Sequence, residues 1–448
     1  MGARSGLAFA LVAAIVASVG CGPVGLGSTA KRPPPDVPLA LEAFSLPNGL
    51  EVIVSPDRSR DAVGLDMTYR VGWLDDPPNR PGLAHLVEHL MFTNLEHLPE
   101  GYDAYMRSLG ASGANGSTGA TETHYHVVVP TGGLEGALWV ERERMTSSFA
   151  SLAPERVAAE VRILEDEARL RGDLDPQRSV TRTLLRLVEH GDGALAPPEQ
   201  LRGVDAARDI APFQARAYAP NRATLVVTGN VGPTLRAQLA RLLGDIPAIG
   251  PAPSRAREEP RVLEGRRETM RTSGRRPIVG IAWGVPPSTS PEGLATRTAL
   301  GIAARTITTS GASFDRFGAA ELSFYDTGLG AVAVLTVEGK PGASAATLEG
   351  DVLDVVDDEV VVTSSMAQDA SVAAQNSLLA AMDRMGPRAR TLALLRAEQG
   401  ASPSLELALA SRTISQADVV DALQRRVRAK RHRAILRVVP EAKAGAGP

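Results

Sequence analysis

The sequence is short of the residues from which several kinds of site and segment are built. It has one cysteine and 4% aromatic residues in 448 positions, and its longest apolar run falls short of the about twenty residues of a membrane-spanning helix. A single cysteine excludes an intramolecular disulfide and any cysteine-based metal or redox centre. A net charge of −3 and an isoelectric point near 6.2 leave no overall field that attracts nucleic acid. We therefore expect no nucleic-acid partner.

What the chain does contain is typical of a globular protein, since 44% of its residues are hydrophobic and 22% are charged. A chain of 448 residues exceeds the size at which one hydrophobic core keeps growing. Two domains are therefore the expected organisation.

The N-terminus has the outline of an export signal. A lone Arg4 precedes an apolar run from about residue 6 to residue 19, and small residues lead to Cys21. The stretch "SVGC" resembles a bacterial lipobox, with Ser18 where leucine is usual. We expect residues 1–21 to be the signal and Cys21 to be lipidated, ordinary signal cleavage nearby being the alternative. Residues 22–42, rich in Gly, Ser and Pro, are expected to form a flexible tether to a bacterial membrane facing the periplasm, with the outer membrane favoured.

Periods of two and of 3.6 residues alternate along the rest of the chain. Strands are predicted over 46–56, 62–73, 123–130 and 222–231, and helices over 82–92, 133–145 and 154–171. Alternating strands and helices predict an α+β fold of mixed α/β layers.

The second half of the sequence partly repeats the first. "VGLDMTYRVGWLDDPPNRPGLAHLVEH", from Val63, is echoed by "VGIAWGVPPSTSPEGLATRTAL", from Val279. Between the halves lies a stretch rich in Pro, Gly and charge. We therefore predict an N-terminal domain over 43–250, a linker over 251–270, a C-terminal domain over 271–442 and a tail over 443–448.

The first half of this echo contains "HLVEH", an HxxEH pattern on a predicted helix. His85, Glu88 and His89 fall within about 100° of one another on such a helix and so share one face. Two imidazoles one turn apart suit a single Zn²⁺ ion, and Glu88 would lie beside it, able to take a proton from water. In the echo these three positions hold Thr296, Ala299 and Leu300, so the second half lacks the ligands.

Catalytic zinc usually has three protein ligands, and the helix at 154–171 offers two candidates for the third. Glu160 and Glu167 lie two turns apart on the same side of its apolar stripe. The residues alone do not decide between them. A rival pair, His124 and His126, faces one side of a predicted strand but has no further ligand at a suitable sequence spacing.

The chain resembles the pitrilysin/insulinase family of inverted-motif zinc metallopeptidases, most closely the short members like mitochondrial processing peptidase. The matching segments, in the family's order, are "LPNGLEVIV", "RVGWLDDP", "GLAHLVEHLMF", "ERERM", "EVRILEDEARLR" and "YAPNRATLVVTGNV". This resemblance implies two related α/β domains, each a mostly antiparallel sheet covered by helices, facing each other across a chamber.

The resemblance also implies roles for individual residues. His85, His89 and Glu167 would hold one zinc ion per chain, Glu88 would be the general base, and Glu160 would support the ligands. Asn115 would hold the backbone of a peptide substrate added to a strand edge.

In the second half, Arg316 and Tyr325 are the candidates for the family's pair that holds the substrate carbonyl, although their spacing matches poorly. The family includes pairs of subunits in which one carries the zinc and the other this clamp. We therefore expect an exported zinc metalloendopeptidase acting on peptides or unfolded segments, with a homologous subunit as partner. The alternatives are a binding or assembly subunit on the same scaffold and an unrelated periplasmic α/β binding lipoprotein.

Overall fold

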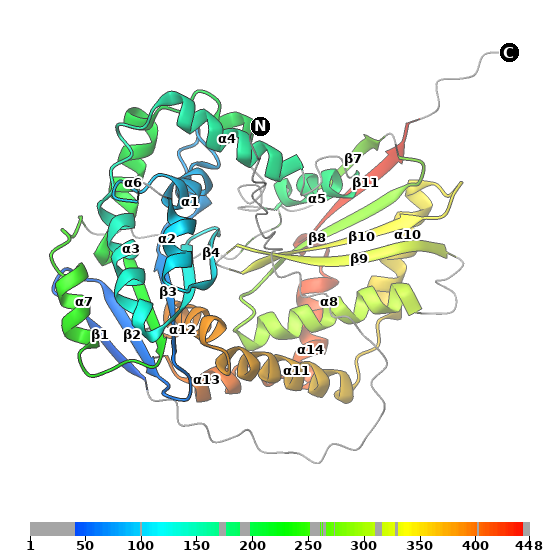
Figure 1. Ribbon diagram of the computed structural model, residues 1–448. Coiled ribbons are helices and arrows are strands. Elements are labelled where there is room, and N and C mark those ends of the chain that lie inside the picture. Colours follow the sequence, from blue (N-terminus) through cyan, green and yellow to red (C-terminus); the bar gives the residue numbers. More distant parts are fainter. Residues whose placement is uncertain are drawn as a thin grey trace, which may run out of the picture. The chain divides into compact units, whose positions relative to one another are not determined.

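The computed structural model contains two β-sheets, each covered by helices (Figure 1). The first has the strand order β1-β2-β6-β3-β5-β4 and the second the order β7-β11-β8-β10-β9. The structure describes residues 41–98, 101–169, 176–188, 198–250, 260, 262, 266–272, 274–309, 316–327, 330–400 and 403–441. The predicted signal, Cys21, nearly all of the tether and most of the linker and tail lie outside these ranges.

The first sheet belongs to the N-terminal part of the chain. Its strands are β1 (Glu42–Ser45), β2 (Glu51–Pro56), β3 (Ala62–Tyr69), β4 (Ser112–Thr118), β5 (Thr123–Pro130) and β6 (Ala223–Gly229). The helices of this part are α1 (Leu83–Thr93), α2 (Tyr102–Ser108), α3 (Leu134–Thr146), α4 (Pro154–Ala168), α5 (Pro176–Arg186), α6 (Ala211–Ala217) and α7 (Leu235–Leu243). The strands β2, β3, β5 and β6 and the helices α1, α3 and α4 agree with the elements predicted from residue periodicity, while the other elements of this part were not predicted.

The second sheet belongs to the C-terminal part. Its strands are β7 (Arg267–Thr272), β8 (Ile278–Val285), β9 (Phe317–Asp326), β10 (Ala331–Gly339) and β11 (Arg433–Pro440). The helices of this part are α8 (Pro291–Thr309), α10 (Ala345–Asp354), α11 (Ser364–Met382), α12 (Met385–Gln399), α13 (Leu405–Ala410) and α14 (Gln416–Ala422).

The two sheets repeat one topology. In the first, β2 is parallel to β6, and β6, β3, β5 and β4 then follow in antiparallel pairs. In the second, β7 is parallel to β11, and β11, β8, β10 and β9 follow in antiparallel pairs. The sequence echo at Val63 and Val279 therefore marks equivalent strands, β3 and β8.

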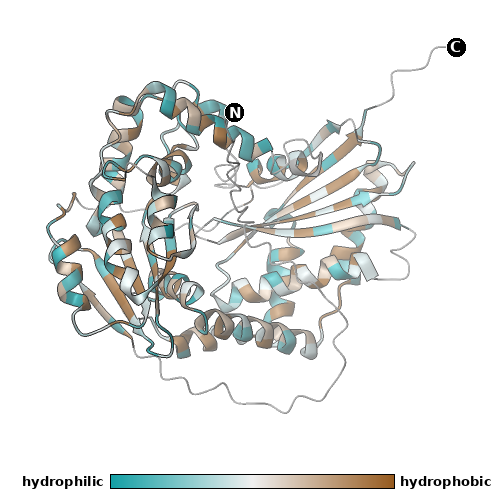
Figure 2. Ribbon diagram, viewed as in Figure 1, coloured by the Kyte–Doolittle hydropathy of each residue, from teal (hydrophilic) through white to brown (hydrophobic). Residues whose placement is uncertain are grey.

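The central strands are covered on both faces, and their sequences reflect this. Every residue of β6 is buried, as is every residue of β3 after Ala62, because helices pack on each side. Figure 2 shows the contrast with the helices, since hydrophobic and hydrophilic residues alternate along α4, which has one face toward the core.

One helix from each half covers the sheet of the other half. Helix α5 packs Val180 and Leu184 onto Val332 and Leu436 of the second sheet. In return, α12 packs onto Ile53 and Val226 of the first sheet, with Ala389, Leu392, Ala393 and Leu395. Each sheet therefore needs the other half of the chain to cover its second face.

The echo explains how these helices come so close. A Cβ atom on Gly64 of β3 would lie 3.0 Å from the carbonyl carbon of Met385, at the start of α12. A Cβ atom on the equivalent Gly280 of β8 would lie 2.5 Å from Cδ1 of Leu184 in α5. Both glycines thus leave room for a helix of the opposite half.

Ion pairs set the position of α12 along the first sheet. Arg388 pairs with Asp57 at 3.0 Å, and Arg396 pairs with Glu51 at 2.7 Å. A third arginine, Arg390, pairs with Glu122, the residue before β5. Three arginines on one helix, each meeting a carboxylate of the other half, fix its register.

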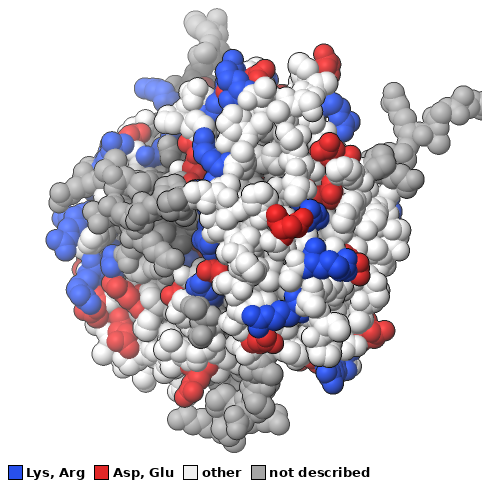
Figure 3. Space-filling model, turned by 90° about the vertical axis from the view of Figure 1, so that its left-hand side faces the viewer, with Lys and Arg blue, Asp and Glu red and all other residues white. Residues whose placement is uncertain are grey.

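The surface carries charges of both signs. On the face shown in Figure 3, Lys and Arg side chains lie among Asp and Glu side chains, as 48 basic and 51 acidic residues would suggest. Among the helices in the described ranges, none is at once long and apolar enough to cross a bilayer.

Replacing Gly64 by alanine tests the close approach of α12. The new Cβ atom would meet the Thr228 hydroxyl at 2.8 Å and the Met385 backbone at 3.0 Å, so we expect a loss of about 1–3 kcal/mol in the free energy of unfolding. The matched control is Gly301→Ala in α8, where the Cβ atom meets nothing within 4 Å, and we expect no loss there. Thermal unfolding midpoints compare the two; equal midpoints would contradict the tight contact.

Candidate metal centre

Helix α1 presents HxxEH at the surface of the first core. Leu86, Val87 and Leu90 are fully buried, while His85 and His89 are partly exposed, with ring centroids 4.9 Å apart. The apolar residues between the histidines anchor the helix, as expected from their spacing, and leave both imidazoles on one side.

The start of α1 is held by a carboxylate from the preceding loop. Gly82, in the left-handed conformation (φ 89°), has no side chain to cap the helix. Asp76 takes this role, because Oδ2 accepts a hydrogen bond from the Gly82 amide at 2.6 Å and Oδ1 one from the Ala84 amide at 2.8 Å. Burial raises the pKa of Asp76 to about 7 against the lowering effect of these hydrogen bonds.

His89 lies between the two glutamates that the sequence could not rank. Its Nε2 atom is 3.5 Å from Oε1 of Glu167, and its Nδ1 atom is 3.8 Å from Oε2 of Glu160. Each carboxylate therefore faces a different nitrogen of the same ring. Burial disfavours the imidazolium, but Glu160, Glu88 and Glu167 outweigh it and raise the pKa of His89.

His85, His89 and Glu167 form a group whose donor atoms all lie within 4.8 Å of one another. Two imidazoles and a carboxylate are a common donor set for catalytic zinc. Glu160 lies on the far side of His89, where an outer carboxylate orients a ligating histidine. The residues present thus fit a zinc ion, with Glu167 closer to the ligand position than Glu160.

The other acidic residues of α4 point elsewhere. Glu165 pairs with Arg202 at 2.7 Å, and Asp166 pairs with Arg169 at 3.0 Å. The stripe of Val157, Val161 and Leu164 is buried and sets which carboxylates turn toward α1.

Glu88 is buried, with 7% of its surface exposed, although it has a carboxyl group. The Thr118 hydroxyl donates a hydrogen bond of 2.6 Å to its Oε2 atom, and a Cβ atom on Gly116 would lie 3.1 Å from its Oε1 atom. Burial raises the pKa of Glu88, which His89 and Thr118 partly offset. Glu88 is therefore held between α1 and strand β4.

Strand β4 is an edge of the first sheet within the described residues, because only β5 pairs with it. Asn115 lies on this strand opposite His126 and is partly buried. The residues expected to bind peptide backbone thus belong to the same strand that holds Glu88.

The structure does not bring Arg316 and Tyr325 together. Arg316 directly precedes β9 and pairs with Glu359 at 2.9 Å, while Tyr325 lies near the other end of β9 and packs toward α5. Nine residues of extended strand span about 30 Å. The structure therefore places these two side chains near opposite ends of one strand.

In the second half, the positions equivalent to the proposed metal ligands are occupied by core residues. Thr296, Ala299 and Leu300 of α8 are all at most 1% exposed and belong to the buried interior of that half. The positions equivalent to His85, Glu88 and His89 thus contribute to a core.

Three further residues escaped the sequence analysis. Asp76 stands six residues before Gly82, outside the usual capping spacing, and Thr118 is an ordinary residue of strand β4 with no pattern that marks it. Asp66 lies on β3 opposite His126, and only the pairing of strands reveals that contact.

Comparisons with known proteins agree with this geometry. The model of the family described as insulinase (peptidase family M16) matches residues 51–185, and that described as the peptidase M16 inactive domain matches residues 206–305. Together they cover more than half of the chain. The chain belongs to the insulinase family of peptidases, which confirms the resemblance noted in its sequence.

Two curated relatives match over limited segments. The insulin-degrading enzyme of Drosophila melanogaster is 30% identical over 199 residues, 42% of this chain and 20% of the relative. The zinc protease PqqE of Helicobacter pylori is 28% identical over 137 residues, 30% of each chain. The chain therefore aligns with less than a third of the length of either relative.

Solved structures share the fold. A protease from Helicobacter pylori gives a TM-score of 0.73 at 17% identity, covering 90% of this chain and 100% of the other. The periplasmic protease PqqL from Escherichia coli gives 0.65 at 18% identity, covering 90% of this chain and 48% of the other.

Replacing Asp76 by alanine tests the cap of α1, and we expect a loss of about 1 kcal/mol in stability at pH 5. The folded-state pKa of Asp76, about 7, lies above its ordinary value of 3.8. A raised acid pKa stabilises the folded state below the unfolded-state pKa, and this contribution is lost as pH rises through about 7. The difference between wild type and variant in urea midpoints should therefore narrow from pH 5 to pH 8. A difference that widens would contradict the raised pKa.

Proposed function

We propose that this chain is an exported zinc metalloendopeptidase that hydrolyses peptides or unfolded polypeptide segments. The observation that carries the proposal is the convergence of His85, His89 and Glu167, from two separate helices, within 4.8 Å. Buried Glu88, directly beside His89 on α1, completes the set.

Zinc bound by these three residues would supply Lewis-acid chemistry, lowering the pKa of a water molecule toward neutrality and polarising a peptide carbonyl. Glu160, with its Oε2 atom 3.8 Å from Nδ1 of His89, is placed to orient that ring once the ligands close on the metal. Retaining all of these groups on a purely structural scaffold would have no physical reason, since four polar side chains gathered at one place are costly unless paired.

Glu88 is the general base of the proposed reaction. It takes a proton from water and delivers it to the departing amine nitrogen. Its raised pKa suits the first of these transfers, because a more basic carboxylate takes up a proton more readily. Thr118 keeps the carboxylate on the side of β4.

The substrate is an extended peptide that adds to the β4 edge. Main-chain hydrogen bonds to an edge strand bind peptides with loose sequence preference. Asn115 on the same strand would hold the peptide backbone, and the contact between Gly116 and Glu88 would keep the bound strand next to the base.

A homologous partner subunit is proposed to supply the group that holds the substrate carbonyl. The separation of Arg316 and Tyr325 along β9 favours this, as does the loss of ligands at Thr296 and its neighbours. The same observation supports the second candidate function, a binding or assembly subunit that does not cleave peptides without its partner.

The proposed location is the periplasm, with Cys21 as a lipid anchor. The fold similarity to a protein described as a periplasmic protease supports this location. The domain limits 43–250 and 271–442 are likewise proposed, with α5 and α12 each serving the other half.

Three glutamates of one helix test the proposed centre. We expect Glu167→Gln to lose one equivalent of zinc relative to wild type, and Glu160→Gln to bind it about 10–100-fold more weakly. Glu165→Gln, the control on the other side of α4, should keep wild-type zinc content. Elemental analysis and peptide cleavage are measured on the same samples.

Equal zinc in the Glu167 and Glu165 variants would exclude Glu167 as a ligand. A wild-type protein that binds zinc but does not cleave peptides would favour a subunit that needs its partner over a peptidase that is active alone.

Removing the Thr118 hydroxyl tests the positioning of Glu88. We expect Thr118→Val to lower kcat about tenfold, the value of one hydrogen bond to a charged group, with little change in KM or zinc content. Ser117→Ala, an exposed neighbour on the same strand, is the control. An equal loss in both variants would assign the effect to the strand instead of the hydrogen bond.

A further inference from the structure

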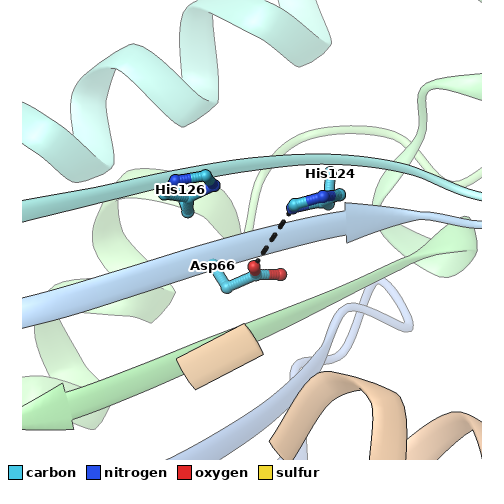
Figure 4. Close-up of side chains that lie close together, drawn as sticks. All are labelled: Asp66, His124 and His126. Atoms are coloured by element: carbon cyan, nitrogen blue, oxygen red, sulfur yellow. Dashed lines mark ion pairs between the residues drawn. The ribbon is translucent and has the colours of Figure 1, made fainter. Parts of the chain in front are cut away.

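A second cluster of metal-ligating side chains lies on the first sheet, on the face opposite α1. Asp66 of β3 and His124 and His126 of β5 alternate with Met67 and Tyr125, which point into the main core. Figure 4 shows the two imidazoles on one strand and the carboxylate on its neighbour. Helix α12 packs against β3 and β5 on this face.

Strand pairing creates the cluster. Asp66 is the direct antiparallel partner of His126, and His124 is two residues further along β5 on the same face. The ligand atoms of all three residues lie within 4.8 Å of one another. Sequence spacing did not reveal Asp66 as a third donor, because it lies far along the chain from the two histidines.

The cluster contains buried polar atoms without partners. Oδ2 of Asp66, Nδ1 of His124 and Nδ1 of His126 are all buried and have no hydrogen-bond partner among the described residues. Asp66 itself is 0% exposed. Buried polar atoms are nearly always satisfied, and these three residues place their ligand atoms within 4.8 Å of one another, where one cation could serve all of them.

A simple pair of His124 and Asp66 does not account for the arrangement. Their closest atoms are 3.4 Å apart, longer than an ordinary N–H···O hydrogen bond, and such a pair leaves His126 unmatched. Donor atoms about 2.0–2.2 Å from one tetrahedral metal ion lie about 3.3–3.5 Å apart. The observed separation fits a shared ion better than a direct bond.

The neighbouring groups hold Asp66 in place. The Thr68 hydroxyl donates a hydrogen bond of 2.6 Å to Oδ1 of Asp66, which leaves Oδ2 for a ligand. Arg390 of α12 donates to the Thr68 hydroxyl at 3.4 Å, and Glu122 balances its charge. Such an outer set of hydrogen bonds is typical of ligating carboxylates.

We propose that Asp66, His124 and His126 bind a second divalent transition-metal ion, such as Zn²⁺, distinct from the ion expected at HxxEH. Two imidazoles and one carboxylate suit ions of this class and not Ca²⁺ or Mg²⁺. The ion has a structural role, because it joins β3 to β5 beneath α12. His124 is 13% exposed, so the cluster is not sealed from solvent.

The test is the zinc stoichiometry of the purified full chain after dialysis against a defined Zn²⁺ concentration. We expect two equivalents in the wild type, one in His126→Gln and one in Glu167→Gln, with none in the double variant. His432→Gln, a partly buried histidine outside both clusters, is the control and should keep two. Added Zn²⁺ should raise the thermal midpoint of the wild type more than that of His126→Gln.

The two sites fail independently in this design. Two equivalents in a folded His126→Gln protein, or only one equivalent in the wild type that Glu167→Gln removes, would overturn the second site. If His126→Gln lost one equivalent of zinc and Glu167→Gln lost none, the result would support the second site and contradict the proposed peptidase centre. Should His126→Gln fail to fold, Asp66→Asn, which keeps an oxygen for Thr68, provides the same comparison.

Discussion

The packing of α4 against α1 is the contact on which the candidate centre depends. Neither helix could form the site alone, since α1 offers two imidazoles and α4 offers only carboxylates. Their apolar residues, Leu90 on one side and Val161 and Leu164 on the other, bury the helices in one core. Burial of these few side chains, each contributing about 1.5–3 kcal/mol, therefore also determines which glutamates face His89.

Three carboxylates gather at this contact, and their mutual repulsion needs a compensating positive charge. Glu88, Glu160 and Glu167 surround His89, and like charges brought together raise the free energy of the folded state. A divalent cation relieves this repulsion, which links metal binding to stability. Electrostatic repulsion of this kind is typical of functional sites, where the arrangement of groups serves chemistry and not stability.

Much of this arrangement follows from the sequence by ordinary rules. Periodicity predicts β3, α1 and α4, and helical spacing places His85, Glu88 and His89 on one face, because these are local properties. Helical spacing alone did not distinguish Glu160 from Glu167. In the structure, each of the two carboxylates faces a different nitrogen of the His89 ring. That distinction depends on the rotamer of another helix's side chain, which no spacing encodes.

Tertiary pairing explains what was missed. Asp66 meets His126 through the register of two strands, and sixty residues of sequence separate them. Helices α5 and α12 were not among the predicted elements, and the cover that each gives to the sheet of the other half is a tertiary contact. Arg316 and Tyr325 are close in sequence but lie near opposite ends of the extended strand β9, which separates them in space.

The placement of α12 has a consequence for the order in which the chain can fold. The first sheet is complete in strands at Gly229, yet one of its faces waits for residues 385–399. A chain that emerges from its N-terminus, during synthesis or during passage through a membrane, exposes that face until most of its length is out. The apolar face of the first sheet thus stays uncovered until α12 is available. Chaperones that bind exposed apolar surface would recognise the chain in this state.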